Sequence, residues 1–154
     1  LASGICPTLD LIKAGCRVGL GVDGSASNDC SNMIQEVRQS LLQQRLRYGA
    51  EDITAEYALG LATNGSASLL HRQDIGDISM GKQADLAIFD LSELRFSGAG
   101  DPIAAIVTCG AHRVDKLMLA GKWVIEEGEH FAINEQELLI EHTKLAKKLQ
   151  SAVN

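Results

Sequence analysis

Apolar residues recur at every third or fourth position in three parts of the chain, which is the spacing of an amphipathic helix. The first pattern predicts a helix over residues 33–48, and its apolar positions are Ile34, Val37, Leu41, Leu42 and Leu46. The second predicts a helix over 54–63 that Asn64-Gly65 breaks, followed by a short helical piece over 67–70. The third predicts a terminal helix over 134–153, whose stripe consists of Leu138, Leu139, His142, Leu145, Ala146 and Leu149.

The other segments are shorter. Residues 7–14 fit a helix with Pro7 in its first turn and Gly15 as its left-handed stop. An apolar strand over 17–22 follows. After residue 74 the pattern becomes β-like, with short strands expected over 75–79, 84–90, 114–119 and 122–125, the last two forming a hairpin around Ala120-Gly121, and one or two helical turns over 103–108. A strand among helices, followed by a run of strands, predicts an α/β fold.

The composition excludes several classes of protein. The 154 residues are 45% hydrophobic and 22% charged, as in an ordinary globular domain. A net charge of −6 and an aromatic content of 4% argue against a nucleic-acid surface, and no apolar run approaches the ~20 residues that span a bilayer. The four cysteines are scattered, so they are expected to be buried, reduced thiols of a cytoplasmic protein.

One motif resembles a phosphate-binding loop but does not satisfy its requirements. Residues 76–82 match G-x-x-x-x-G-K, yet Gln83 stands where a Ser or Thr would hold magnesium, and a strand rather than a helix is expected to follow. We therefore interpret Gly81-Lys82 as a turn. The four histidines form no metal-binding motif among themselves, and no G-x-S-x-G nucleophile elbow is present.

Asp23 is the strongest candidate for chemistry. It comes directly after the apolar strand over 17–22 and before a loop of small residues, Gly24-Ser25-Ala26-Ser27-Asn28-Asp29. In α/β barrels the catalytic groups lie at the C-terminal ends of such strands. An aspartate in this position also caps turns by accepting a hydrogen bond from a nearby backbone amide. The spacing alone leaves both interpretations open.

Four segments, in this order and spacing, resemble the C-terminal part of the amidohydrolase superfamily. They are Gly19-Leu20-Gly21-Val22-Asp23-Gly24-Ser25-Ala26-Ser27-Asn28-Asp29, Ala58-Leu59-Gly60-Leu61-Ala62-Thr63, the stretch over 76–90, and the late hairpin over 114–124. The Asp23 loop is similar to the eighth-strand loop of the deaminase and triazine-hydrolase branch, and within it to the 8-oxoguanine deaminases.

The resemblance implies a fold and a division of the chain. Such enzymes are (β/α)8 TIM-like barrels with a small β-sandwich. Residues 1–72 would be the C-terminal portion of the barrel, with strand eight and its closing helices. Residues 73–128 would be the C-terminal share of the sandwich, and 129–154 the terminal helix.

The resemblance also implies a site. One divalent metal ion, zinc or alternatively iron, would be held partly by Asp23, which would also transfer protons. Ser25 and Asn28 would orient either the substrate or only the loop. The implied reaction is the hydrolytic deamination of a purine-type ring, with 8-oxoguanine giving urate and ammonia. The alternatives are a triazine (hydroxyatrazine-type) amino- or chlorohydrolase, another purine or pterin deaminase, and a non-catalytic binding module in which Asp23 is only a turn residue.

The remaining machinery of this superfamily is not in these residues. An H-x-H from strand one, histidines from strands five and six and an upstream glutamate are all missing from the sequence. A complete barrel takes about 250 residues. We therefore expect a C-terminal fragment whose partners are the N-terminal part of the same polypeptide and a small heterocyclic substrate. Whether the terminal helix forms a homodimer or covers its own barrel stays open.

Overall fold

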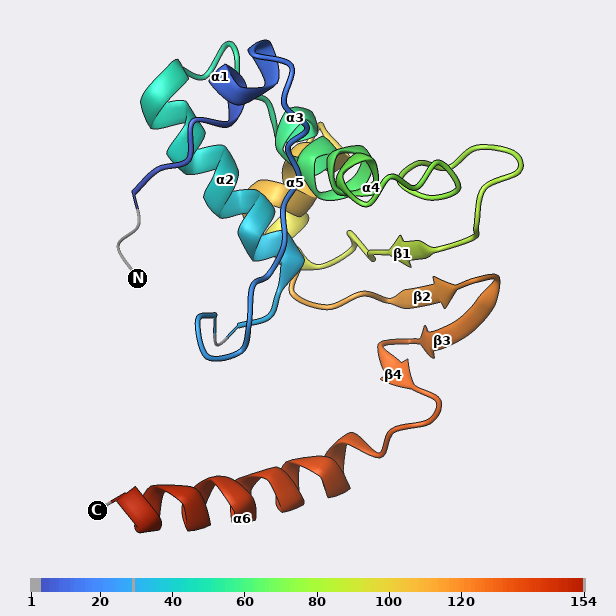
Figure 1. Ribbon diagram of the computed structural model, residues 1–154. Helices are drawn as coiled ribbons and strands as arrows, with labels where there is room; N and C mark the ends of the chain where they lie inside the picture. The colour runs from blue at the N-terminus through green and yellow to red at the C-terminus, as the bar shows by residue number, and fades with distance from the viewer. Residues whose placement is uncertain (1–3, 29, 154) are drawn as a thin grey trace.

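The computed structural model describes residues 4–28 and 30–153 of the chain, and combines helices with one small antiparallel sheet (Figure 1). Its helical segments are α1 (Thr8–Lys13), α2 (Met33–Tyr48), α3 (Ala55–Gly60), the π-helix η1 (Leu61–Gly65), α4 (Ser66–Leu69), the 3-10 helix η2 (Leu94–Phe96), α5 (Pro102–Cys109) and α6 (Glu135–Val153). Its strands are β1 (Leu86–Ile88), β2 (Lys116–Leu119), β3 (Lys122–Glu126) and β4 (Glu129–His130).

The principal core lies where α2, α3 and α5 pack together. Val37 and Leu41 of α2 are fully buried against Ala58 of α3 and Val107 of α5, and Ile53 closes the cluster from the loop before α3. These α2 residues belong to the predicted apolar stripe, so that pattern is confirmed. The stripe is not buried over its whole length, because Leu46 near the C-terminal end of α2 is 84% exposed.

Side-chain caps begin the main helices. Asn32 accepts a hydrogen bond from the Gln35 backbone at the start of α2, and Thr54 accepts one from Tyr57 at the start of α3. Asp101 caps α5 in the same way, with Pro102 in the first turn. Each of these bonds satisfies a backbone N–H that the helix itself leaves without a partner. The sequence offers three possible caps for α2, namely Asp29, Ser31 and Asn32. Asn32 is the residue used, and Asp29 lies outside the described residues.

The predicted break at Asn64-Gly65 is wrong. The helical backbone runs from α3 through η1 into α4, with Gly60 and Gly65 both in the right-handed region. A β-carbon on Gly65 would lie 2.5 Å from the Val18 carbonyl oxygen, so glycine is needed here for a close approach and not for a turn. Such π-type insertions within helices are often found at functional sites.

The expected strand over residues 17–22 is not formed. The segment is extended, but within the described parts of the chain no strand pairs with it. Leu20 instead donates its backbone N–H to the Leu61 carbonyl oxygen at 3.1 Å, and its own carbonyl accepts from the Ser66 hydroxyl at 2.8 Å. A β-strand is defined by backbone hydrogen bonds to a neighbouring strand. The helices α3–α4 therefore hold this segment from one side.

The sheet has the strand order β1-β2-β3-β4, with every neighbouring pair antiparallel. The predicted hairpin is confirmed, since β2 and β3 are joined by Ala120 and Gly121, which have φ values of 49° and 78°. The predicted strand over 75–79 is wrong. That stretch is a loop held by the ion pairs Arg72–Asp74 and Lys82–Asp77, and its Ile78 is 89% exposed.

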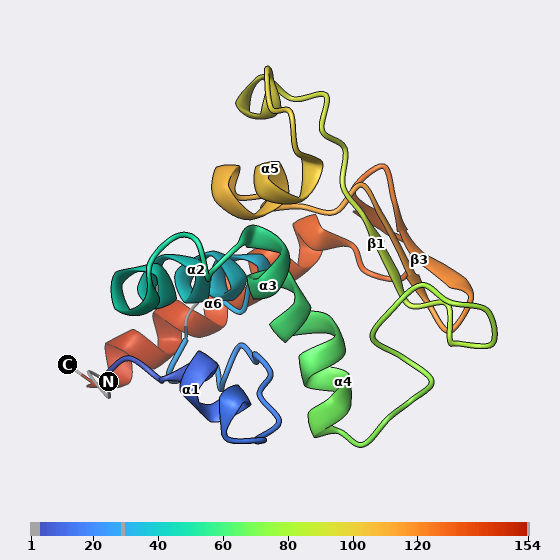
Figure 2. The same ribbon diagram turned by 90° about the horizontal axis from the view of Figure 1, so that it is seen from above.

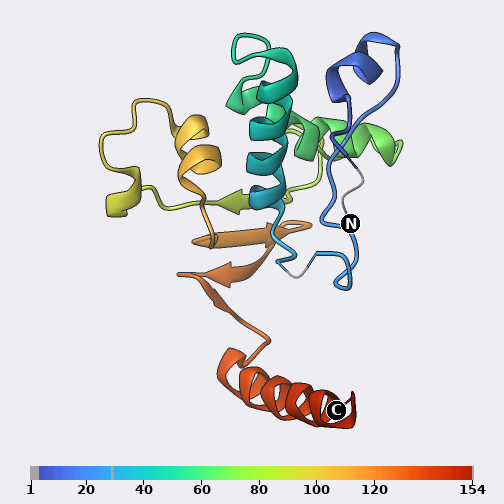
Figure 3. The same ribbon diagram turned by 90° about the vertical axis from the view of Figure 1, so that its left-hand side faces the viewer.

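The α6 helix stands apart from the other helices. Seen from two sides, the sheet lies between the α1–α5 layer and α6, and from above α6 runs beneath α2 (Figures 1, 2 and 3). Its predicted stripe contacts little of the described chain, because Leu138, Leu145 and Leu149 are 54%, 65% and 69% exposed. Of the described helices, none combines the length and apolarity that a membrane crossing requires.

The cysteines correct one further expectation. All four are free thiols, but each is exposed and not buried. The reason is their position, since Cys6, Cys16 and Cys30 lie in connecting segments and Cys109 ends α5.

Candidate functional site

Asp23 ends the extended segment after α1 and begins a tight loop. Its backbone φ is 63°, in the left-handed region where Asp is more frequent than most other side chains. The side chain is exposed, and its Oδ1 accepts a hydrogen bond of 2.8 Å from the Gly24 backbone N–H. Its Oδ2 has no hydrogen-bond partner in residues 4–28 and 30–153. Asp23 therefore caps the loop through one oxygen and presents the other.

The loop after Asp23 is a single compact turn. The backbone N–H groups of Ser27 and Asn28 both donate to the Gly24 carbonyl oxygen, at 2.8 and 2.9 Å. The Ser25 side chain is exposed, and no group in the described chain bonds to its hydroxyl. Ser25 is thus available to an external group, whereas the turn is held by its own backbone.

Asn28 uses both ends of its side chain locally. Its Nδ2 donates to Glu36 Oε1 at 2.6 Å, and its Oδ1 accepts from the Cys30 backbone N–H at 3.1 Å. Both Asn28 and Glu36 are half-buried. Glu36 lies in the first turn of α2, and the sequence analysis did not include it in the site. An acid in the first turn of a helix is common for electrostatic reasons alone, so only the fold identifies its partner.

Asp23 does not form a metal centre by itself. The described residues contain no group of three or more His, Cys, Asp or Glu side chains that would hold an ion. Asp23 lines neither the hollow of ≈ 360 Å³ between α2 and α5 nor the hollow of ≈ 270 Å³ between Arg17 and Lys82. One exposed carboxylate oxygen is a suitable hard ligand for a divalent cation, but within residues 4–28 and 30–153 it is not joined by the two further ligands that an ion site needs.

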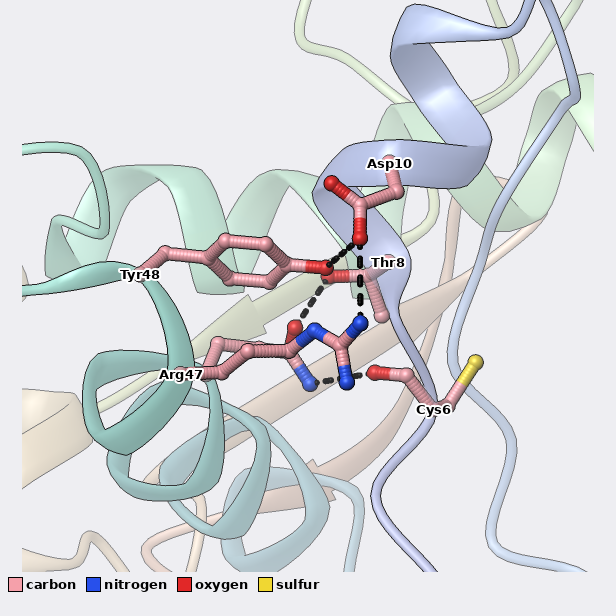
Figure 4. Close-up of polar contacts among 6 residues, drawn as sticks. Cys6, Thr8, Asp10, Arg47 and Tyr48 are labelled. Carbon is pink, nitrogen blue, oxygen red and sulfur yellow. Dashed lines mark hydrogen bonds and ion pairs between the residues drawn. The ribbon is translucent and has the colours of Figure 1, made fainter.

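A second polar cluster joins α1 to α2 (Figure 4). The buried Gln44 side chain accepts from the Thr8 hydroxyl at 2.9 Å and donates to the Cys6 carbonyl oxygen at 2.8 Å. Beside it, Asp10 accepts a hydrogen bond of 2.8 Å from the Tyr48 hydroxyl and pairs with the Arg47 guanidinium at 3.2 Å. The cluster thus fastens α1 to the core helix.

Interactions within this cluster shift the pKa values of its ionisable groups. The Tyr48 hydrogen bond, together with Arg47, lowers the pKa of the Asp10 carboxyl below its ordinary value. Burial and the bond to Asp10 raise the pKa of Tyr48. Each bond in the cluster is made within the chain, so we interpret it as a structural feature.

Comparison with known families identifies the class of protein to which this chain belongs. The family model of the amidohydrolases (Amidohydrolase family) matches residues 1–124, and the chain belongs to this family. In sequence, the chain is similar to an 8-oxoguanine deaminase from Pseudomonas aeruginosa, with 57% identity over 149 residues, which are 97% of this chain and 33% of that protein.

Solved structures show the same relationship. The chain superposes with a TM-score of 0.90 on an adenosine deaminase from Xanthomonas campestris with bound zinc, at 30% identity, covering 98% of this chain and 35% of the other. It superposes with a TM-score of 0.84 on the zinc complex of an atrazine chlorohydrolase from Arthrobacter aurescens, at 29% identity, covering 92% and 32% of the two chains. The chain therefore spans about a third of the length of the proteins it matches.

Proposed function

We propose that this chain is the C-terminal part of a metal-dependent aminohydrolase that deaminates a purine-type ring, with 8-oxoguanine as substrate and urate and ammonia as products. The observation that carries the proposal is the 57% identity with an 8-oxoguanine deaminase along 97% of the chain. The reaction balances without a redox partner, because 8-oxoguanine and one water give urate and one ammonia.

The proposal includes a division of the chain. Residues 1–72 would complete a (β/α)8 barrel, with 17–22 as its eighth strand. Residues 73–128, with β1 to β3, would be the C-terminal share of a small sandwich, and 129–154, which include β4 and α6, would be the terminal helix. The backbone over 17–22 is extended, and no strand of the described chain pairs with it, which supports this division because in a barrel both edges of a strand are hydrogen-bonded to neighbours.

Asp23 would carry the proton transfers. Its Oδ2, which has no partner among the described residues, would take a proton from the attacking water and later deliver it to the departing amine nitrogen, the role of a positioned general acid–base. The bond from the Gly24 N–H to Oδ1 fixes the orientation of the carboxylate. The left-handed backbone at Asp23 supports a functional role, because conformations of this kind cluster at active sites.

A divalent metal, when bound, would supply the Lewis acidity that lowers the pKa of water toward neutrality. Asp23 fits as one oxygen ligand, and the other ligands would come from polypeptide beyond this chain. Zinc is supported by the zinc-containing structures that the chain superposes on, and iron is the alternative.

A triazine hydrolase is the second candidate, favoured by the superposition on the atrazine chlorohydrolase. Ammonia release from 8-oxoguanine, guanine, isoxanthopterin and hydroxyatrazine, measured with the complete gene product, separates the candidates. Turnover of 8-oxoguanine well above the other three supports the proposal, and preference for hydroxyatrazine overturns it. Metal analysis of the same preparation distinguishes zinc from iron, and absence of any bound metal favours the non-catalytic module.

The role of Asp23 is tested in the same protein with Asp23→Asn. We expect at least a 100-fold loss of turnover, the lower end of what general acid–base catalysis contributes. Asn tolerates the left-handed backbone, so the fold is kept. The matched control is Asp52→Asn, which changes an exposed loop aspartate and leaves turnover unchanged. Near-normal activity of Asp23→Asn would exclude the proposed role.

A further inference from the structure

The loop that presents Asp23 is attached to the protein at both ends. At its start, Asp23 continues the segment that Leu20 ties to α3–α4, with a hydrogen bond of 3.1 Å to the Leu61 carbonyl oxygen. At its end, the Asn28 side chain is bonded to Glu36 at 2.6 Å. Between these points the turn is closed by the two hydrogen bonds to the Gly24 carbonyl oxygen.

Glu36 is a rigid anchor for this bond. Val37, the next residue, is fully buried in the helical core, so the first turns of α2 cannot shift without repacking that core. The start of α2 is already capped by Asn32, whose Oδ1 accepts from the Gln35 backbone N–H at 3.2 Å. The Glu36 carboxylate is therefore not needed as a cap, and its hydrogen bond reaches back to the loop instead.

The Asn28–Glu36 bond is also of the stronger kind. A hydrogen bond from a neutral amide to a carboxylate is charge-assisted, and it is half-buried here. Because the Asn28 carbonyl oxygen is occupied by the Cys30 N–H, both ends of the amide are in use. Of the two roles open to Asn28, contact with a substrate or orientation of the loop, the geometry favours the second.

We propose that Glu36 is a positioning residue, which acts through Asn28 to fix the turn that carries Asp23. The proposal rests on the proposed function, because the position of Asp23 matters only if its carboxylate takes part in the reaction. Core packing fixes α2, Glu36 fixes Asn28, and Asn28 fixes the turn next to Asp23. Displacement of a catalytic group by about 1 Å is enough to slow a reaction roughly 100-fold.

The variants Glu36→Ala and Asn28→Ala in the complete gene product test this. Each should lower kcat for 8-oxoguanine by about 10- to 100-fold with KM changed less than about 3-fold, since the attacking group is misplaced while substrate binding is retained. The double variant should be no worse than Asn28→Ala alone, because the bond to Glu36 is already lost in that variant. Glu36→Gln keeps an acceptor oxygen and should restore most of the kcat. The matched control is Glu56→Ala, which removes the first-turn glutamate of α3 and should leave kcat unchanged.

A second readout does not depend on activity. Amide hydrogen exchange at Ser27 and Asn28, whose N–H groups donate to Gly24, should become at least about 10-fold faster in Glu36→Ala and stay unchanged in Glu56→Ala. Unchanged exchange at these amides, or a kcat of Glu36→Ala equal to that of Glu56→Ala, overturns the inference. If Asp23→Asn is itself fully active, the proposed function fails, while the exchange measurement still decides whether Glu36 holds the loop.

Discussion

Gly65 lies so close to Val18 that a β-carbon on it would come within 2.5 Å of the Val18 carbonyl oxygen. The contact joins the middle of the α3–η1–α4 helix to the extended segment that leads to Asp23. Backbone packs directly on backbone here, and a neighbouring glycine takes part, because a β-carbon on Gly19 would meet Ser66 at 2.7 Å. The position of the Asp23 segment therefore depends on glycines on both sides of one contact.

We expect Gly65→Ala to destabilise the protein by about 1–3 kcal/mol, the usual cost of adding a methyl group to a packed site. Its φ of −61° is helical, so the cost is steric and not conformational. Gly60→Ala is the matched control, with a φ of −57° and nothing within 4 Å of the added carbon, and it should be neutral or stabilising by up to about 1 kcal/mol. Urea denaturation measures both. Equal effects of the two changes would contradict the close approach.

Gln44→Leu should destabilise the protein by about 1–3 kcal/mol although it makes the core more apolar. The Gln44 side chain is 2% exposed and bonds to Thr8 and to the Cys6 carbonyl oxygen, and its loss leaves the hydroxyl of the buried Thr8 without the acceptor to which it donates. Gln39→Leu, on the exposed face of the same helix, should stay within about 0.5 kcal/mol of the wild type. A stabilised Gln44→Leu variant in the same denaturation series would show that these hydrogen bonds contribute nothing.

The Asp10 carboxyl should titrate below its ordinary range, and Tyr48→Phe should raise its pKa, because the Tyr48 hydrogen bond is the largest cause of the lowering. A carboxyl whose pKa is lowered by folding stabilises the protein above its unfolded pKa of about 3.9, and the contribution is lost as the pH falls through the folded pKa. Tyr48→Phe should therefore weaken this dependence below about pH 4. Carboxyl NMR titration measures the Asp10 pKa, with Tyr57→Phe as the control. An Asp10 pKa that is unchanged in Tyr48→Phe would show that the Tyr48 hydrogen bond does not lower it.

Local patterns predicted the elements that depend on local interactions. The apolar spacing over 33–48 and the cap at Asn32 define α2, and the Ala120-Gly121 pair defines the β2–β3 hairpin. Elements that depend on distant partners could not be predicted this way. Residues 17–22 have the composition of a strand, yet strand pairing needs neighbours that the described chain does not contain. Asn64-Gly65 has the composition of a helix break, but Gly65 instead allows the close approach of the Val18 carbonyl oxygen to a continuous helix.

The candidate site, too, could be predicted only where its interactions are local in sequence. Asp23 was found because its position after an apolar segment resembles a known loop, and its interactions with Gly24 are local. Glu36 was missed because its bond to Asn28 crosses from the loop to a helix, and an acid in a first helical turn has an ordinary electrostatic explanation. Only the fold distinguishes Glu36 from Glu56, which occupies the equivalent turn of α3.

Ala120 occupies a position where its side chain is unfavourable, and changing it should stabilise the protein. Its φ is 49° and that of Gly121 is 78°, the pair of positive values that defines a type I′ turn. Asn is preferred at the first of these positions, whereas alanine pays a steric penalty there, so Ala120→Asn should raise the free energy of unfolding by about 0.5–1 kcal/mol. The Ala120 backbone N–H still donates to Asp85 at 2.7 Å in the variant, because that bond involves no side-chain atom of residue 120. Gly121→Ala places a side chain at the second positive φ and should lower stability by about 1 kcal/mol. Denaturant titration of both variants checks the pair, and loss of stability in Ala120→Asn would mean that the turn is not of this type.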